Sequence, residues 1–203
     1  MAMLQSEKLS DVKNDYYQLG LSVREIAAKN NVSIDAAYYF FRRHCLKRRG
    51  SAENNFLRFE KKQPSFLIKK ALSANLLKLK IAGTMLYWAE GSKWSGEKIV
   101  DFANSDPQMI SLFMSFLREV CGIDDSKIRI YLYCHSNYNS QELIDYWSDI
   151  TKIPKQQFTK PYIKESITNS KQNKMFHGLI HVRYNDKKLL ILIRQWIKEY
   201  TKI

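Results

Sequence analysis

Residues 127–135 read KIRIYLYCH, a strict alternation between apolar side chains and basic or aromatic ones. Side chains of a β-strand point alternately to the two faces of its sheet. One face of this strand therefore carries Lys127, Arg129, Tyr131, Tyr133 and His135, and the other face is apolar. The stretch predicts a sheet with one face on a hydrophobic core and the other face basic and aromatic.

The same alternation recurs in two later stretches. Their outward faces are predicted to carry Tyr162, Lys164 and Ser166 in the first stretch, and His181 and Arg183 in the second. Lys and Arg bind phosphates and guanine edges, and Tyr offers a hydrogen bond and a flat surface. Three such strand faces together predict a surface that binds nucleic acid.

Helical patterns surround these strands. Helices are expected at residues 72–89, 109–120, 141–150 and 187–202, with a further strand at 99–103. The chain is therefore predicted to be an α+β protein. We expect an N-terminal three-helix helix-turn-helix, and after it an α/β domain with an antiparallel sheet that has helices on one face.

Residues 1–50 form the predicted N-terminal domain, with short helices within residues 9–49. Ser22 and Glu25 stand in the spacing of a capping box, which begins a helix. Asn31 tolerates the left-handed conformation of a tight turn, and Ser33 can cap the helix that follows. A helix, a tight turn and a second helix that ends in basic residues resembles the helix-turn-helix of DNA-binding proteins.

That resemblance implies a DNA-binding role for the second helix and for the basic cluster after it. The residues expected to contact the major groove or the phosphates are Ser33, Asp35, Ala36, Tyr39, Arg42, Arg43, Lys47, Arg48 and Arg49. The alternative is a three-helix bundle that packs only on its neighbour and has a solvated basic end. Residues 51–69 change in composition and are predicted to be a basic linker between the two domains.

The composition limits the partners. Lys and Arg number 33 against 20 Asp and Glu, a formal charge of +13, which favours nucleic acid first and an acidic membrane surface second. The three cysteines lack C-x-x-C spacing and are expected to be reduced thiols, without a zinc site. Neither a signal peptide nor a membrane-spanning run is evident. We expect a cytoplasmic protein, associated with the nucleoid in a prokaryote, without a membrane partner or a small-molecule ligand.

Residues 81–93 read IAGTMLYWAEGSK and end their predicted helix at Glu90-Gly91. This segment resembles a divergent LAGLIDADG motif, the signature helix of the homing-endonuclease fold. The resemblance covers residues 70–203 and implies that the motif helices of two halves pack together. Small residues such as Gly83 would permit this close approach. Because only one motif is present, the resemblance implies a homodimer on matching DNA half-sites.

In the same family an acidic residue before the closing glycine binds a divalent metal. The resemblance therefore makes Glu90 the candidate catalytic and metal-binding residue for Mg²⁺. Lys93, which is close to Glu90 in the sequence, is a candidate DNA-binding residue whose charge could stabilise the phosphate. Trp88 stands where the family usually has Asp, and Met85 where it often has Gly. Some regulators join a helix-turn-helix to such a domain after its catalysis has been lost.

Three functions follow as hypotheses. The first is a regulatory protein that binds double-stranded DNA in a sequence-specific way, through the helix-turn-helix and the basic sheet face. The alternative is a Mg²⁺-dependent homing-type endonuclease that uses Glu90, so whether the chain is an enzyme is left open. A third hypothesis is an RNA-binding module in which the tyrosine-rich strand stacks bases.

Overall fold

The computed structural model describes residues 4–69, 71–165 and 176–202. The chain divides into two compact units, Met1–Gln63 and Pro64–Ile203. Each unit has a hydrophobic core of its own. Ser166, which was expected on an outward strand face, lies outside the described residues.

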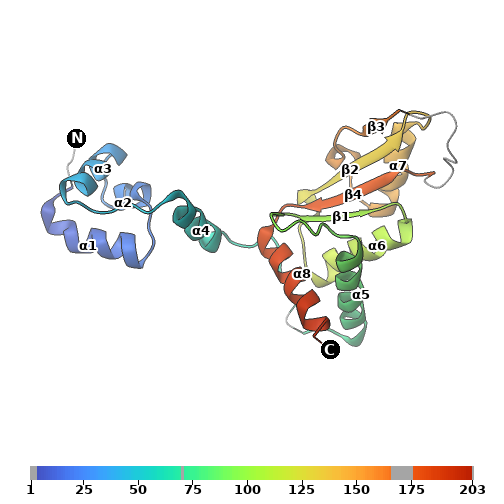
Figure 1. Cartoon of the computed structure of the whole chain (residues 1–203), viewed down its shortest axis with the longest axis horizontal. Coiled ribbons are helices and arrows are strands. Elements are labelled where there is room, and N and C mark those ends of the chain that lie inside the picture. The colour runs from blue at the N-terminus through green and yellow to red at the C-terminus, as the bar shows by residue number, and fades with distance from the viewer. Residues whose placement is uncertain (1–3, 70, 166–175, 203) are drawn as a thin grey trace. The chain divides into compact units, whose positions relative to one another are not determined.

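The N-terminal unit is helical (Figure 1). It contains α1 (Leu9–Lys13), continued by a π-helical turn, and then α2 (Val23–Lys29), α3 (Ile34–Arg43) and α4 (Ser51–Lys61). The first three helices and the π-helical turn bury one apolar cluster, whose buried members are Val12, Tyr16, Val23, Ile26, Ala27, Ala37, Phe40 and Phe41. The core therefore requires all three helices.

The predicted helix boundaries of this unit are confirmed by their caps. Ser22 Oγ accepts from the Glu25 amide at 3.2 Å, and Glu25 Oε2 accepts from the Ser22 amide at 2.6 Å, which together make the capping box. Asn31 has a φ of 53° in the turn. Ser33 Oγ caps α3 by accepting from the Ala36 amide at 3.1 Å. Local sequence alone therefore sets where α2 ends and α3 begins.

The predicted linker is partly helical, since α4 occupies its first half. α4 buries none of its residues, and polar contacts hold it within the N-terminal unit. Lys61 Nζ donates to the Gly20 carbonyl at 3.0 Å, and Asn54 Nδ2 donates to the Arg49 carbonyl at 3.2 Å. Phe66 and Ile68, at the other end of the predicted linker, pack on the core of the C-terminal unit.

The C-terminal unit is α+β, as the sequence predicts. Its elements are α5 (Ala74–Glu90), β1 (Val100–Asn104), α6 (Pro107–Ser115) with a π-helical continuation to Val120, β2 (Ile128–His135), α7 (Ser140–Thr151), β3 (Tyr162–Lys164), β4 (Leu179–Tyr184) and α8 (Lys187–Tyr200). The strand order in the sheet is β1-β4-β2-β3 (Figure 1).

One expectation about the sheet is wrong. β4 is antiparallel to both β1 and β2, but β3 runs parallel to β2, so the sheet is mixed and not antiparallel throughout. The physical reason is the connection. The chain crosses over through α7 before β3, and such a crossover returns a strand in the direction of the one it left.

The predicted two-faced sheet is confirmed. In β2 and β4 every second residue is buried, and the residues between them are partly or fully exposed. The helices of the unit lie on the buried face (Figure 1), where they share one core with the sheet. The other face carries the basic and aromatic side chains.

Phe116 joins the helices of this core. Its ring lies 5.7 Å from that of Phe113 and 6.2 Å from that of Trp196 on α8. Phe113 in turn stacks on Phe102 of β1 at 4.1 Å. α5 reaches the same centre at Gly83, where an added Cβ would lie 2.2 Å from Phe116 Cγ. The close approach that Gly83 permits is therefore used within this chain.

Asp186 attaches the start of the C-terminal unit to α8. Oδ1 accepts from the Lys188 and Leu189 amides, at 2.8 Å and 3.2 Å, and so caps α8. Oδ2 accepts from both the amide and the hydroxyl of Ser65, each at 2.8 Å. Burial alone would raise the pKa of this carboxyl, but these hydrogen bonds hold the pKa below its ordinary value.

We predict that Gly83→Ala destabilises the protein by about 1–3 kcal/mol, because the new methyl group must displace Phe116 from a close-packed core. Denaturant unfolding would measure the change. The neighbouring Ala82→Gly variant controls for helix propensity, which on its own favours alanine by about 1 kcal/mol. A Gly83→Ala protein that is more stable than the wild type would show that the contact with Phe116 does not constrain the core.

We predict that Asp186→Asn lowers the free energy of unfolding by about 1–3 kcal/mol at neutral pH, because an amide cannot accept hydrogen bonds at both ends. The lowered pKa gives a stabilisation that is complete above the unfolded-state value and is lost as the pH falls through the folded-state value. The difference between wild type and variant should therefore shrink below about pH 4.

Asp106→Asn is the matched control. Asp106 caps α6 through Oδ1 in the way that Asp186 caps α8. Asn caps a helix about as well as Asp, so this variant should retain nearly all of its stability. An equal loss in both variants would mean that the bonds to Ser65 contribute nothing.

Candidate nucleic-acid interface

The open face of the sheet brings together residues from all four strands. The strand register places Asp101, Arg183 and Arg129 in one row across β1, β4 and β2. A second row contains His181 and Tyr131, and a third contains Tyr133 and Tyr162. The structure thus assembles most of the predicted sheet residues on one surface. We call this surface the sheet face, and its members are Asp101, Arg129, Tyr131, Tyr133, Tyr162, Lys164, His181 and Arg183.

Asp101 is the member of the sheet face that the sequence analysis missed. Its carboxylate accepts from Arg183 Nε at 2.8 Å and lies 2.8 Å from His181 Nδ1. Asp101 is only 8% exposed, while Val100 and Phe102 on either side of it point into the core. This alternation was a usable signal, because an acidic residue between two core residues of a strand must face outward.

Arg183 is held from two sides. Asp101 binds its Nε, and its guanidinium carbon lies 4.1 Å from the centre of the Tyr131 ring. Burial acts to lower the pKa of Arg183, but the charge of Asp101 and the hydrogen bonds with Tyr131 and Asp101 together raise it above its ordinary value. The guanidinium is therefore charged and oriented before any ligand arrives. An arginine that is fixed in this way loses little side-chain entropy on binding.

A row of rings crosses the sheet face beside Arg183. The Tyr133 ring lies 5.4 Å from the ring of Tyr162 and 5.0 Å from the ring of His181. Tyr162, on the edge strand β3, is 61% exposed. Flat rings of this kind can contact sugars and bases as well as donate hydrogen bonds.

Two of the predicted basic residues are less available. Arg129 donates to the Ser126 and Ile128 carbonyls at 2.8 Å and 2.7 Å, so its guanidinium folds back to the start of β2. Lys127 precedes the strand, in a 3-10 turn, and pairs with Asp124 at 3.6 Å. Both lie at one end of β2, whereas Lys164 on β3 is exposed.

The N-terminal unit places most of its predicted residues on its surface. Asp35, Tyr39, Arg42 and Arg43 of α3 are exposed, and Ala36 is half-buried. The Ser33 hydroxyl is used in the cap of α3.

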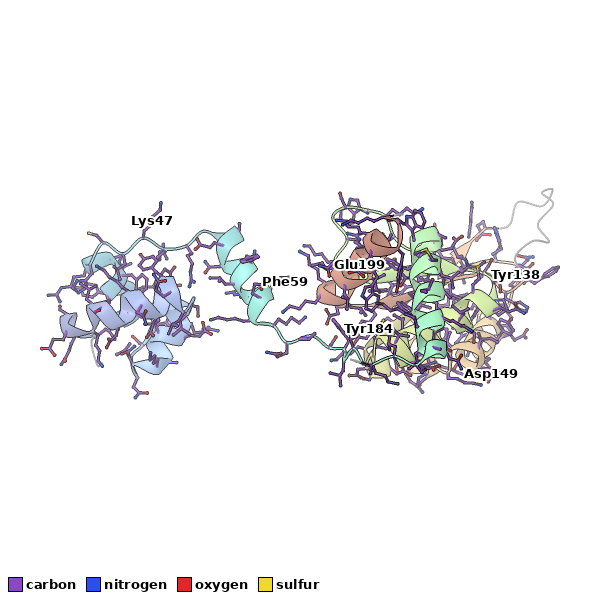
Figure 2. All side chains as sticks on the ribbon, turned by 90° about the horizontal axis from the view of Figure 1, so that it is seen from below. Lys47, Phe59, Tyr138, Asp149, Tyr184 and Glu199 are labelled. Carbon is purple, nitrogen blue, oxygen red and sulfur yellow. The ribbon has the colours of Figure 1, made fainter. Side chains whose placement is uncertain are left out.

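The basic residues after α3 differ from one another. Lys47 points away from the helices of the unit (Figure 2), and Arg48 lies over the Tyr38 ring at 5.4 Å. Arg49 is engaged in the fold instead, since it donates to the Leu21 carbonyl and its guanidinium lies 4.0 Å from the centre of the Tyr16 ring. We therefore treat Arg49 as a residue that shapes this surface.

Glu90 is the last residue of α5 and is exposed, and Lys93 follows in the exposed turn after it. Within residues 4–69, 71–165 and 176–202, no three His, Cys, Asp or Glu side chains come together as metal ligands. Mg²⁺ is bound by several oxygen ligands in octahedral geometry. Glu90 belongs to no such group among the described residues, so a Mg²⁺ ion held there would take most of its ligands from water and from phosphate oxygens.

α5 also carries apolar side chains on its surface. Leu77, Ile81 and Trp88 are large and exposed, and their spacing places them on one side of the helix. This stripe, and not Gly83, is the part of α5 that a second copy could contact.

Comparisons of the chain with protein families, with curated proteins and with solved structures find no match. Among the described residues, no helix is long and apolar enough to cross a membrane.

We predict that Asp101→Asn destabilises the protein by about 1–3 kcal/mol, because Arg183 and His181 lose the carboxylate that they share. Denaturant unfolding would measure this loss. Asp149→Asn is the control, since Asp149 pairs with Lys152 at 2.7 Å and both side chains are largely exposed. Such a surface pair contributes about 0–1 kcal/mol. If both variants lost the same small amount, Asp101 would have no special role on the sheet face.

Proposed function

We propose that this protein binds double-stranded DNA in a sequence-specific way and acts as a regulator. The observation that carries the proposal is the sheet face, where Arg183 is held by Asp101 and Tyr131 beside a row of aromatic rings. The formal charge of +13 supports a polyanionic partner. An oriented arginine is suited to guanine, because its parallel N–H groups match the two acceptors of that base in the major groove.

The N-terminal unit supports the same proposal. α3 exposes Tyr39, Arg42 and Arg43, and Lys47 and Arg48 follow on the surface. α3 has 10 residues and a capped N-terminus. A recognition helix of this kind contacts base edges in the major groove through its N-terminal residues. In this proposal α3 and the sheet face both contact DNA, and the lysines and arginines around them bind phosphates.

We further propose a homodimer through α5. The apolar stripe Leu77, Ile81 and Trp88 lies on the motif-like helix and is exposed in the single chain. Two chains paired through this stripe would present two equivalent sheet faces, and a two-fold symmetric DNA site would match them.

The alternative functions receive unequal support. The row of Tyr162, Tyr133 and His181 favours stacking of unpaired bases, so single-stranded RNA is the competitor to include in a binding assay. For cleavage of DNA, the exposed Glu90 supplies only one carboxylate. Metal-dependent nicking of plasmid DNA that disappears in Glu90→Gln would be needed to establish that activity.

The test of the main proposal is selection of bound sites from random duplex DNA, followed by salt titration. We expect a two-fold symmetric site and a steep loss of affinity with salt. Arg183→Gln should weaken binding to the selected site by about 1–3 kcal/mol and relax the preference at one base pair of each half-site. Lys152→Gln, which removes the same charge from the exposed end of α7, should leave that preference intact.

Two results would contradict the proposal. Binding that salt scarcely changes would show that the basic surfaces serve another kind of partner. Tighter binding of single-stranded RNA than of the selected duplex would assign the sheet face to RNA.

A further inference from the structure

A basic groove lies within the N-terminal unit, where α2 begins, where α3 begins and where the chain enters α4. Four arginines line this groove: Arg24, Arg48, Arg49 and Arg58. Ser22, Ser51 and Asn54 add hydroxyl and amide groups to its wall. Among the described residues, no Asp or Glu lines it. A concave surface with this composition is suited to an anion.

The arginines have different roles in the groove. Arg49 is a fixed part of its wall, since it donates to the Leu21 carbonyl and packs on Tyr16, and its own amide donates to Tyr16 Oη at 2.8 Å. The exposed side chains of Arg24 and Arg58 make no ion pair or hydrogen bond with any residue that the structure describes. They are therefore available to a ligand without the loss of an internal contact.

The positive surface continues on the other side of Arg24 and Arg58. A second hollow is lined by these two arginines together with Lys61 and Lys62. Of the described residues that line this second hollow, one is acidic: Glu25, which accepts from the Ser22 amide and lies 3.7 Å from Lys61. The hydrogen bond from the Ser22 amide and the charge of Lys61 lower the pKa of Glu25, so its charge is already compensated.

The ligand class follows from chemistry and position. Arginine binds phosphate oxygens through pairs of N–H groups, and the two unesterified oxygens of a phosphodiester can be shared between two arginines. Ile34 and Tyr38 of α3 also line the groove. The anion would thus lie beside the proposed recognition helix, where the backbone phosphates that flank a major groove are found.

We propose that this groove is a binding site for a backbone phosphate of nucleic acid, with Arg24 and Arg58 as the side chains that grip it. The inference rests on the proposed function and adds a contact that the helix-turn-helix residues do not include. It also gives α4 a role, since this helix supplies Arg58 and the residues at its start. α4 then belongs to the DNA-binding surface and is more than a connection between domains.

The experiment compares the full-length wild type with the double variant Arg24→Gln, Arg58→Gln on duplex DNA over a range of salt concentrations. Because both arginines bind the same phosphate, their loss should remove one phosphate contact for each bound chain. We therefore expect the slope of log affinity against log salt to fall by about 0.9 per chain, or about 2 for a dimer on two half-sites. The loss of affinity should be the same for the selected site and for unrelated duplexes, because phosphates carry no sequence information.

The matched control is the double variant Lys8→Gln, Lys13→Gln. It removes the same charge from two exposed lysines, Lys8 in the turn before α1 and Lys13 at the end of α1, and neither residue lines the groove or the second hollow. Its slope should stay close to that of the wild type. A set of duplexes with one neutral methylphosphonate each adds a positional test. One linkage in each half-site should weaken the wild type and leave the arginine variant unaffected.

The outcomes separate the two proposals. If the wild type shows steep salt dependence and the arginine variant keeps the same slope, the groove does not bind phosphate, while the proposed function stands. If the arginine and lysine variants lose the same slope, the effect is one of net charge and the groove inference is overturned. If wild-type binding does not depend on salt, both proposals are overturned.

Discussion

Phe116 packs against Gly83 so closely that no side chain fits between them, and the arrangement of the C-terminal unit depends on this contact. The same ring touches Phe113 and Trp196, and through Phe113 the contact extends to Phe102 of the sheet. α5, α6, α8 and β1 are therefore fixed to one another by a connected set of aromatic side chains. Because this core lies on one face of the sheet, the opposite strand positions are left for charged and aromatic residues.

The charges on that open face are organised and not only accumulated. A surface of lysines and arginines alone would attract a polyanion without orienting it. Asp101 lowers the net positive charge of the sheet face, but it fixes Arg183 and His181 in place. A lower charge with fixed side chains favours recognition of a particular ligand over simple attraction, because pre-organised groups lose less entropy when a ligand binds. The N-terminal unit uses Arg49 in a similar way, as a fixed wall beside arginines that are free to bind.

Local patterns predicted much of this structure. The alternation in residues 127–135 gave the orientation of β2, and the capping residues Ser22 and Ser33 gave the starts of α2 and α3. The predictions failed where the outcome depended on distant contacts. The parallel pairing of β3 follows from a crossover, the engagement of Arg49 from Tyr16, and the partner of Gly83 from the packing of Phe116. These partners are far apart in the sequence, and no fixed spacing between residues identifies them as partners.

The hydrogen bonds between Ser65 and Asp186 have a practical consequence for dissecting the chain. Pro64, Ser65 and Phe66 look like the end of a connector, yet Ser65 and Phe66 are integral to the C-terminal unit. A fragment that starts at the first turn of α5 would lack the residues that satisfy Asp186 and would expose the core beneath Phe66. The two units are best separated between Gln63 and Pro64, which keeps α4 with the arginine groove and Ser65 with α8.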